Sequence, residues 1–332
     1  MTIPDGLENC RPPLSTQLFG NRRIFVEAMV KFKDCMGLIS GLRQDSFAVE
    51  KTLAKVQEQG RKYPRVAQEL AAVRYYLHFS IYACQNEWRQ FHKGITNYAT
   101  LLREIDRWRY EFSEEVCFVT FNYDTMLEEA MDQVLKIKFP DLASYIAVRD
   151  YALFKVHGSI DWGIEMNGYN RHGFSPGDEY SKGSIPTRDT YQFFIDHAAS
   201  INLSSRYRKT SHYPMYLEGD VFLFPAVAIP VENKDECVCP ADHVEALGKR
   251  LQKVNKIITI GWRATEDKFV SMLTPMIQGN THFMIVTGTQ DGAKATFQNI
   301  GGRAHHVSKL IGGGFTSLIK NLSDLDAFLR NP

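Results

Sequence analysis

The hydrophobic pattern changes character once along the chain, at Val116. Before that point, from Phe25 to about Trp108, stretches such as "VEKTLAKVQEQG" and "RVAQELAAVRYYLHF" place apolar residues at helical spacing with almost no helix breakers. After it, short apolar runs alternate with helical segments. Strands that alternate with helices predict an α/β fold with a parallel, doubly wound sheet, preceded by a mostly helical region.

The first apolar run, "VCFVTF" at 116–121, is typical of a parallel strand that is buried on both faces. By the same pattern, the predicted parallel sheet includes 117–121, 153–157, 256–260 and 283–287, with helices near 125–137, 241–254, 266–278 and 292–300. Residues 163–219 are rich in Gly, Ser, Tyr and Arg and have weak periodicity. We therefore expect long loops there, with one short helix around 189–199.

Composition and charge narrow the class of protein. The 332 residues are 44% hydrophobic and 23% charged, as in a globular protein with a full core. With 39 Lys and Arg against 38 Asp and Glu, the net charge of +1 disfavours direct nucleic-acid binding. No apolar stretch approaches the roughly 18–20 residues of a membrane helix, the N-terminus lacks a signal-peptide pattern, and the six cysteines are scattered. These features favour a reduced, cytoplasmic protein.

Four loops follow predicted strands: "FNYD" at 121–124, "VHGSIDW" at 156–162, "AIPVENK" at 228–234 and "IGWRATED" at 260–267. Loops at the carboxyl ends of a doubly wound sheet converge on one crevice. The polar side chains expected there are those of Asn122, Asp124, His157, Asp161, Lys234, Glu266 and Asp267. His157 is the candidate general base, because the unperturbed imidazole pKa lies near neutrality.

These candidates also have purely structural interpretations. Asn122 and Asp124 are residue types that cap a following helix, and a lone histidine before glycine fits a hydrogen-bonded core or turn residue. Trp162 and Trp262 fit either the core or a crevice wall. The "GGG" at 312–314 fits a backbone contact with a phosphate or a flexible turn. The residue types alone leave both interpretations open.

The order of the motifs is more specific than any one of them. "TFNYDTMLE", "LFKVHGSIDW", "IPVENK" and "TIGWRATEDKF" together resemble the sirtuin-like family of bacterial anti-phage defence NADases. The resemblance covers roughly 116–330, and the helical region before it matches only in type. It implies a single sirtuin-like domain over 1–332, with a Rossmann-like core at 116–330 and a large helical insertion near the N-terminus, the helical module of 25–108.

The resemblance implies an NAD glycohydrolase that cleaves the bond between nicotinamide and ribose, with NAD as its substrate. By this resemblance, Asn122 places the attacking water at the ribose, Asp124 supports that loop and the ribose hydroxyls, and His157 is the catalytic base. The other residues expected to bind NAD are Tyr123, Gly158, Ser159, Gly261, Trp262, Asp267 and Gly313. Oxygen acceptors suit this chemistry, because positive charge grows on the ribose as neutral nicotinamide leaves.

Two departures from the family pattern change these expectations. Sirtuin deacylases carry a zinc ribbon of four cysteines, whereas Cys237 and Cys239 lack a second pair, so we expect no zinc and NAD hydrolysis rather than deacylation. The family also begins with a strand and a Gly-Ala-Gly-x-Ser loop that holds the pyrophosphate. Here "PPLSTQLF" at 12–19 has no apolar strand before it. Either translation starts upstream or the form is shortened, and we expect the 332-residue chain to bind NAD weakly.

An unregulated NADase would kill its host, so this activity implies control. The family pairs with HerA-type ATPases, Argonaute-like proteins or fused sensor domains, which implies a homo-oligomer and a separate sensor or ATPase partner here. The leading hypothesis is a regulated effector that depletes NAD during phage infection. The alternative is a degenerate sirtuin-like module that binds a nucleotide or a partner without catalysis, and a deacylase is a third hypothesis.

Overall fold

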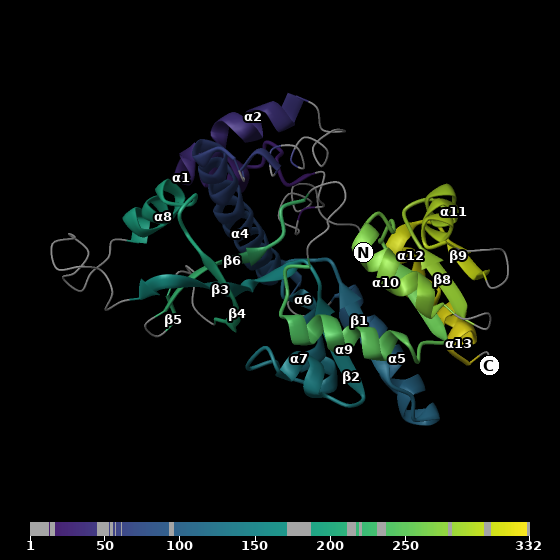
Figure 1. The fold of residues 1–332 in the computed structure, drawn as a ribbon. Helices are drawn as coiled ribbons and strands as arrows, with labels where there is room; N and C mark the ends of the chain where they lie inside the picture. Colours follow the sequence, from purple (N-terminus) through teal and green to yellow (C-terminus); the bar gives the residue numbers. More distant parts are fainter. Residues whose placement is uncertain are drawn as a thin grey trace.

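The computed structural model describes residues 17–44, 58–60, 62–92, 96–170, 187–210, 217–218, 221–230, 237–277, 281–301 and 307–330, together with Pro13, Leu53 and Val56. Three groups of elements follow one another across the molecule (Figure 1). An antiparallel sheet and several of the N-terminal helices lie on one side, and the last three strands with the C-terminal helices lie on the other. The first two strands lie between them.

The region predicted to be helical, 25–108, is mostly helical in its described parts. Its elements are α1 (Arg23–Lys31), the 3-10 helix η3 (Lys33–Cys35), α2 (Met36–Gln44), α4 (Pro64–His92) and α5 (Asn97–Phe112). An N-cap begins α5, because Thr96 Oγ1 accepts the N–H of Ala99 at 3.2 Å. The helix ends at Ser113, whose φ of 55° is left-handed, and the chain then enters the first strand.

The parallel strands form two groups. β1 (Val116–Thr120) pairs with β2 (Tyr151–Lys155), and β7 (Lys256–Ile260), β8 (His282–Val286) and β9 (Val307–Ile311) pair in that order. The helices between and after these strands are α6 (Met126–Leu135), α7 (Ser144–Ala147), α9 (Ala241–Leu251), α10 (Asp267–Leu273), η5 (Thr274–Met276), α11 (Gln290–Asn299), α12 (Gly314–Lys320) and α13 (Leu322–Arg330).

The fold is therefore of the mixed α/β type, and the four predicted parallel strands are confirmed. Their prediction as one continuous sheet is not met within the described residues, because no hydrogen-bonded strand pair joins β1 to β7. A buried apolar run indicates a strand but does not identify its neighbours, and this is why the sequence could not reveal the division into two groups.

The prediction of long loops over 163–219 is wrong for much of that range. β3 (Gly158–Asn170), β4 (Leu203–Lys209), β5 (Leu217–Glu218) and β6 (Val221–Val227) form an antiparallel sheet in the order β4-β3-β6-β5, and the expected short helix is α8 (Thr187–Asp196). Antiparallel strands can keep polar side chains on a solvated face. β4 does so, since several of the side chains in "LSSRYRK" are exposed. The polar composition of β4 is therefore typical of a loop, although the segment is a strand.

Hydrophobic clusters hold the groups together. α4 packs on the antiparallel sheet through Tyr75, whose ring centroid lies 5.4 Å from that of Phe224 and 5.2 Å from that of Tyr191 on α8. Around the parallel strands, one cluster contains residues of α9 and α10 and another contains residues of α5 and α13. Both clusters contain side chains from the two parallel groups, so the same helices cover both groups.

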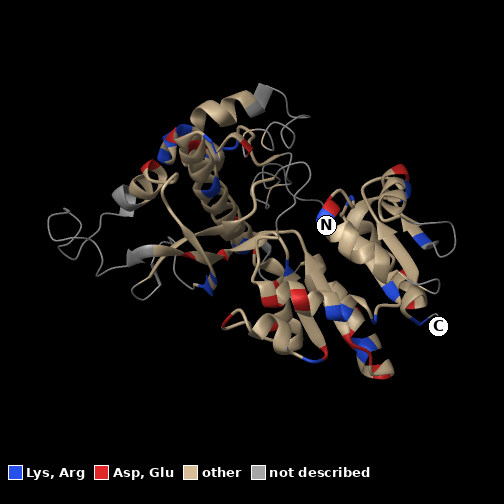
Figure 2. Ribbon diagram, in the orientation of Figure 1, with Lys and Arg blue, Asp and Glu red and all other residues tan. Residues whose placement is uncertain are grey.

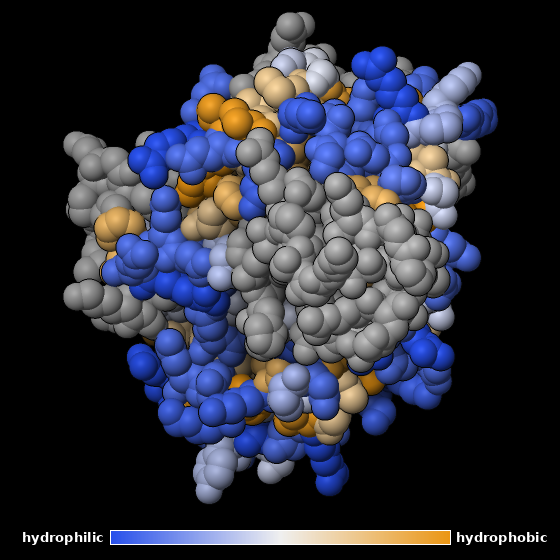
Figure 3. Space-filling view, turned by 90° about the vertical axis from the view of Figure 1, so that its left-hand side faces the viewer, coloured by the Kyte–Doolittle hydropathy of each residue, from blue (hydrophilic) through white to orange (hydrophobic). Residues whose placement is uncertain are grey.

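The surface carries mixed charge. Acidic and basic residues both occur in each of the three groups of elements in Figure 2. α1 exposes Val26 and Val30, the latter by 65%, and Figure 3, which views the side of the molecule on which α1 lies, shows hydrophobic areas between larger hydrophilic ones. Within the part of the chain that the structure describes, no helix is both long enough and apolar enough to cross a membrane.

Candidate active site

The loops that follow β1, β2 and β7 meet around one aromatic side chain. The Phe121 ring stacks on that of Trp262 with a centroid distance of 5.5 Å, and it meets the His157 ring edge-on at 4.9 Å. Phe269 of α10 also contacts the Phe121 ring, at 5.3 Å. Three of the loops predicted to converge are therefore in contact at the carboxyl ends of their strands.

His157 lies inside this aromatic group. Its residue is only 4% exposed, and its ring lies 6.4 Å from that of Tyr123 in a stacked arrangement. Its main-chain oxygen accepts the N–H of Ala228 at 2.9 Å, which ties the turn after β2 to the end of β6. The burial of His157 fits the structural interpretation. It also fits the catalytic one, provided that the substrate reaches the ring.

The turn that carries His157 requires glycine at the next position. Gly158 has a φ of +81°, and a Cβ added there would lie 1.8 Å from the oxygen of Ala226. Ser159 follows and is fully buried. Its Oγ donates to Asp161 Oδ1 at 2.5 Å and to the oxygen of Tyr123 at 3.3 Å. The Ser159 hydroxyl is thus engaged in fixing the turn to the loop after β1.

We expect Gly158→Ala to lower the free energy of unfolding by about 2 kcal/mol or more, because it adds left-handed strain and a clash with backbone. Urea denaturation measures the effect. Gly248→Ala is the matched control, since Gly248 lies within α9 and has open space around it. That variant should gain about 0.5–1 kcal/mol from the better helix former. A Gly158→Ala protein as stable as the parent would contradict the packing described for this turn.

Asn122 is exposed and points toward α5. Its Nδ2 donates to the hydroxyl of Tyr98 at 3.0 Å, and the Tyr98 ring meets that of Phe315 on α12 at 5.5 Å. Gly313 immediately precedes α12 and is exposed, with a φ of +85°. The "GGG" turn is thus linked to Asn122 through Tyr98 and Phe315. Asn122 and His157 lie at neighbouring strand ends, but their side chains contact different groups.

Asp124 has a structural role in the fold. The residue is 8% exposed, and its Oδ1 accepts the N–H of Met126 at 3.1 Å at the start of α6. Burial raises the pKa of Asp124 above its ordinary value, and the positive charge of Lys155 partly opposes that shift. This geometry supports the helix-capping interpretation for Asp124. For Asn122, the recorded side-chain bond goes to Tyr98 instead.

The loop after β7 presents the remaining predicted residues. Gly261 has a φ of +70°, and its N–H donates to the oxygen of Val286 at 2.8 Å. The indole N–H of Trp262 donates to Glu266 Oε2, which fixes the ring that stacks on Phe121. Asp267 is exposed at the first position of α10. Lys234 lies outside the described residues.

A buried ion pair under the site was not predicted from the sequence. The Lys155 side chain is fully buried, and its Nζ lies 2.8 Å from Glu128 Oε1 and also donates to the main-chain oxygen of Asp124. Tyr145 donates to the same carboxylate oxygen at 3.2 Å. Burial raises the pKa of Glu128, while Lys155 opposes the shift. The sequence feature that could have indicated this ion pair is the lysine inside the apolar run "ALFKVHG".

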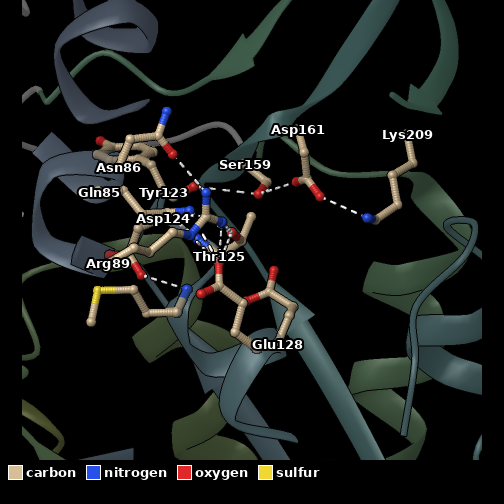
Figure 4. A network of polar contacts seen from close by, with 12 residues as sticks. Gln85, Asn86, Arg89, Tyr123, Asp124, Thr125, Glu128, Ser159, Asp161 and Lys209 are labelled. Carbon is tan, nitrogen blue, oxygen red and sulfur yellow. Dashed lines mark hydrogen bonds and ion pairs between the residues drawn. The ribbon is translucent and has the colours of Figure 1, made fainter. Parts of the chain in front are cut away.

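A polar network connects α4 to the start of α6 (Figure 4). Gln85 donates through Nε2 to Thr125 Oγ1 at 2.7 Å and accepts the N–H of Thr125 at 2.7 Å. Thr125 Oγ1 donates to Glu129 Oε1 at 2.9 Å, and Arg89 pairs with the same carboxylate. On the other side of Figure 4, Lys209 pairs with Asp161 at 2.8 Å. The loop after β1 is therefore held by the helical region.

A cavity of about 500 Å³ lies beside this network. It is lined by Glu128 and Asp161 together with basic residues that include Arg89 and Lys209. None of the residues predicted to be catalytic or to bind NAD lines this cavity. Within the described ranges, no three His, Cys, Asp or Glu side chains are grouped so that they could hold a metal ion.

No protein-family model matches the chain, and no curated protein sequence matches it either. The family resemblance of the motifs therefore stays a prediction.

Proposed function

We propose that this protein is an NAD hydrolase, built on a Rossmann-like doubly wound fold in which the N-terminal helices form an insertion. One observation supports the proposal above all others: the Phe121 ring contacts both His157 and Trp262, so the loops after three parallel strands meet at one edge. The carboxyl edge of parallel strands is where open α/β folds bind nucleotides.

The proposed reaction needs few protein groups. The oxygen of a water molecule bonds to the anomeric carbon of the ribose, the carbon–nitrogen bond to nicotinamide breaks, and a base takes the proton of the water. The products are ADP-ribose and neutral nicotinamide. We assign the placing of the water to Asn122 and the proton to His157, because an amide oxygen stabilises developing positive charge and an imidazole accepts a proton near neutral pH.

The biological role follows from the chemistry. Continuous NAD hydrolysis would be lethal in the cytoplasm, so we propose an effector of anti-phage defence that is silent until a trigger acts on it. Control by a homo-oligomer, or by a separate HerA-type ATPase or Argonaute-like sensor, is part of this proposal. We propose no direct binding of nucleic acid, because the net charge of +1 includes no basic excess.

A second candidate function is a nucleotide-binding or partner-binding module without catalysis. The enclosure of His157 favours it, since the residue is 4% exposed and its ring is in contact with Phe121 and Tyr123. The structural role of Asp124 at α6 also favours it. In this case the crevice would bind a ligand and the ligand would leave unchanged.

Nicotinamide release decides between the two. The purified chain is incubated with NAD at millimolar concentration, and nicotinamide and ADP-ribose are measured by chromatography. Equal amounts of both products support the hydrolase. Binding of NAD without any product supports the module. Release that requires an acyl-lysine peptide would identify a deacylase instead.

We expect the 332-residue chain to bind NAD weakly, with a Kd of roughly 1 mM. This Kd corresponds to a standard binding free energy of about −4 kcal/mol. The reason is that the Gly-rich turn that holds the pyrophosphate in the resembling family has no counterpart in this sequence. Isothermal calorimetry on the monomer measures the affinity. Micromolar binding would mean that other groups, such as the turn at Gly313 or a second protomer, hold the phosphates.

A further inference from the structure

Two cysteines stand on either side of Val238 in the segment that joins β6 to α9. Cys237 is partly exposed, whereas Cys239 is 7% exposed and belongs to the hydrophobic cluster that contains Trp162. Both are free thiols, and their side chains form a hydrogen bond with each other. The segment therefore holds two reduced sulfur atoms in direct contact, one on the solvent side and the other on the core side.

The spacing of the two cysteines allows a disulfide between them. A disulfide usually joins Cα atoms that are about 4.4–6.8 Å apart. Residues i and i+2 of a fully extended chain lie about 6.6–7.2 Å apart. A slight bend of the backbone therefore brings Cys237 and Cys239 within bonding range, and their sulfur atoms already face each other.

The contact also decides which sulfur is reactive. Cys239 donates to Cys237 Sγ, and this hydrogen bond lowers the pKa of the Cys237 thiol to about 7; burial opposes the shift, and the positive charge of Lys268 on α10 favours it. The same hydrogen bond raises the pKa of Cys239, and burial raises it further. The thiolate is the form of cysteine that attacks oxidants. At neutral pH the partly exposed sulfur is therefore the nucleophile, and the buried one keeps its proton.

The backbone of Val238 is bound to the turn that carries His157. Val238 N–H donates to the main-chain oxygen of Val156 at 3.0 Å, immediately before His157 in the chain. The oxygen of Val238 lies close to Gly158, since a Cβ built on that glycine would be 3.1 Å from it. The peptide groups between the two cysteines are thus the ones that pack on this turn.

We propose that Cys237 and Cys239 are an oxidant-sensitive pair, in which hydrogen peroxide converts the two thiols into a disulfide and thereby loosens the turn that carries His157. Cys237 meets the peroxide from the solvent side, and Cys239 resolves the intermediate from the core side. This modification site goes beyond the proposed NAD chemistry and does not depend on it.

The oxidation proceeds in two steps. The Cys237 thiolate attacks one oxygen of hydrogen peroxide, the oxygen–oxygen bond breaks, and the other oxygen leaves as hydroxide, which takes up a proton to form water. Cys237 is then a sulfenic acid, oxidised by two electrons. Cys239 Sγ attacks Cys237 Sγ and gives up its proton, and a second water molecule leaves as the sulfur–oxygen bond breaks. Two thiols and one peroxide thus yield one disulfide and two water molecules.

Closing this disulfide disturbs the contact with the turn. It draws the sulfur atoms from hydrogen-bond contact to about 2.0 Å. The ring that forms is small, because only Val238 separates the cysteines, so its backbone shares the movement. We therefore expect the hydrogen bond from Val238 to Val156 to weaken on oxidation. Because Cys237 is partly exposed, the disulfide is of the kind that thiols reduce readily.

Peptide mapping tests the pair in the 332-residue chain. The reduced protein is treated with hydrogen peroxide at neutral pH, and the remaining thiols are blocked with iodoacetamide before digestion and mass spectrometry. The peptide with Cys237 and Cys239 should lose two hydrogen atoms and escape alkylation, and dithiothreitol should reverse both changes. A peptide that keeps both thiols, or a disulfide from Cys237 to any other cysteine, overturns the proposal.

Cys117 is the matched control within the same digest. It is partly exposed as well, but it lies within β1, where burial raises the pKa of its thiol to about 12. In a brief treatment of the reduced protein with iodoacetamide, Cys237 should react roughly 100-fold faster than Cys117. Equal rates would overturn the assignment of Cys237 as the nucleophile, and this comparison needs no variant to fold.

Two variants separate the roles of the cysteines. Cys239→Ser should stop at the sulfenic acid on Cys237, so dimedone should label Cys237 roughly tenfold more than in the parent, where Cys239 resolves it. Cys237→Ser should leave Cys239 as an unlabelled thiol after the same treatment. Labelling of Cys239 in Cys237→Ser, or no labelling of Cys237 in Cys239→Ser, contradicts the order of attack.

Amide hydrogen exchange tests the effect on the turn. On oxidation, the amides of Val238 and of Ala228, which donates to the oxygen of His157 at 2.9 Å, should exchange roughly tenfold faster. The amide of His282, which donates to the oxygen of Asn255 at 2.8 Å at the start of β8, should not change. These measurements use no NAD, so they can fail while the proposed function stands. Unchanged exchange at Val238 in the oxidised protein would overturn the link between the disulfide and the turn.

Discussion

Nicotinamide release is expected to slow by about 10²–10⁴-fold when His157 is replaced by alanine, the usual cost of losing a general base. The proposal gives His157 the proton of the attacking water, and its ring is positioned for this by Phe121 and by the turn at Gly158. The rate is measured at saturating NAD, in whichever form of the chain releases nicotinamide, so that weaker binding does not enter the result.

A matched control separates catalysis from packing, because His157 is also a buried ring. His243 is 1% exposed, lies 5.5 Å from the ring of Trp162, and its Nε2 is 2.9 Å from the oxygen of Leu142. His243→Ala therefore removes a comparable buried imidazole away from the strand ends. Equal loss of rate in both variants, or an unchanged rate with His157→Ala, would leave His157 with a structural role alone.

The parts of the fold that the sequence predicted are those governed by local pattern. β1 lies in an apolar run that ends at Phe121, and a run of that kind favours a parallel strand, although all five residues of β1 are partly exposed rather than buried on both faces. The helices after β1, β7 and β8 carry apolar residues at helical spacing, and their positions agree with the prediction to within a few residues. Local pattern also placed Asn122 and His157 at strand ends, as observed.

The parts that the sequence missed depend on contacts between distant segments. β4 is paired with β3 in register, Ile164 opposite Tyr207, and its polar face gave no strand signal. Gln85 meets Thr125 from a helix 40 residues earlier in the chain. The direction of a side chain at a strand end is likewise a tertiary property.

The directions of side chains at the strand ends matter most for the site. Asn122 and His157 each follow a parallel strand, yet Asn122 turns to Tyr98 while His157 packs on Phe121. Position along the strand fixes the edge at which a residue lies but not the groups that its side chain meets. A shared catalytic task for the two residues therefore rests on the experiment and not on the strand order.

Lys155→Met is expected to lower the free energy of unfolding by about 3–5 kcal/mol, because it leaves Glu128 buried without its cation. Glu128 Oε2 already has no hydrogen-bond partner among the described atoms, so the carboxylate has little other compensation. Lys155 also donates to the main-chain oxygen of Asp124, which places the pair directly under the loop after β1. Urea denaturation at fixed pH measures the loss.

The pH dependence of the stability of Lys155→Met tests the role of the Glu128 charge separately. Burial raises the pKa of Glu128 above its ordinary value of 4.5, and removing Lys155 removes the charge that opposes this shift. An acidic group whose pKa is raised by folding contributes its full stabilisation at a pH below its pKa in the unfolded chain. This contribution is lost as the pH rises through its pKa in the folded protein. The deficit of Lys155→Met should therefore be smaller at pH 5 than at pH 8.

Two further variants decide whether the lost stability belongs to the buried pair. Lys155→Met combined with Glu128→Leu should be more stable than Lys155→Met alone, because a neutral apolar pair has no charge to desolvate. Lys249→Met removes one partner of an exposed pair on α9, Lys249 and Glu245, whose side chains are 71% and 69% exposed, and should change stability little. If Lys155→Met proved as mild as Lys249→Met, or if the double variant were less stable than the single one, then Lys155 would not stabilise the fold by neutralising Glu128.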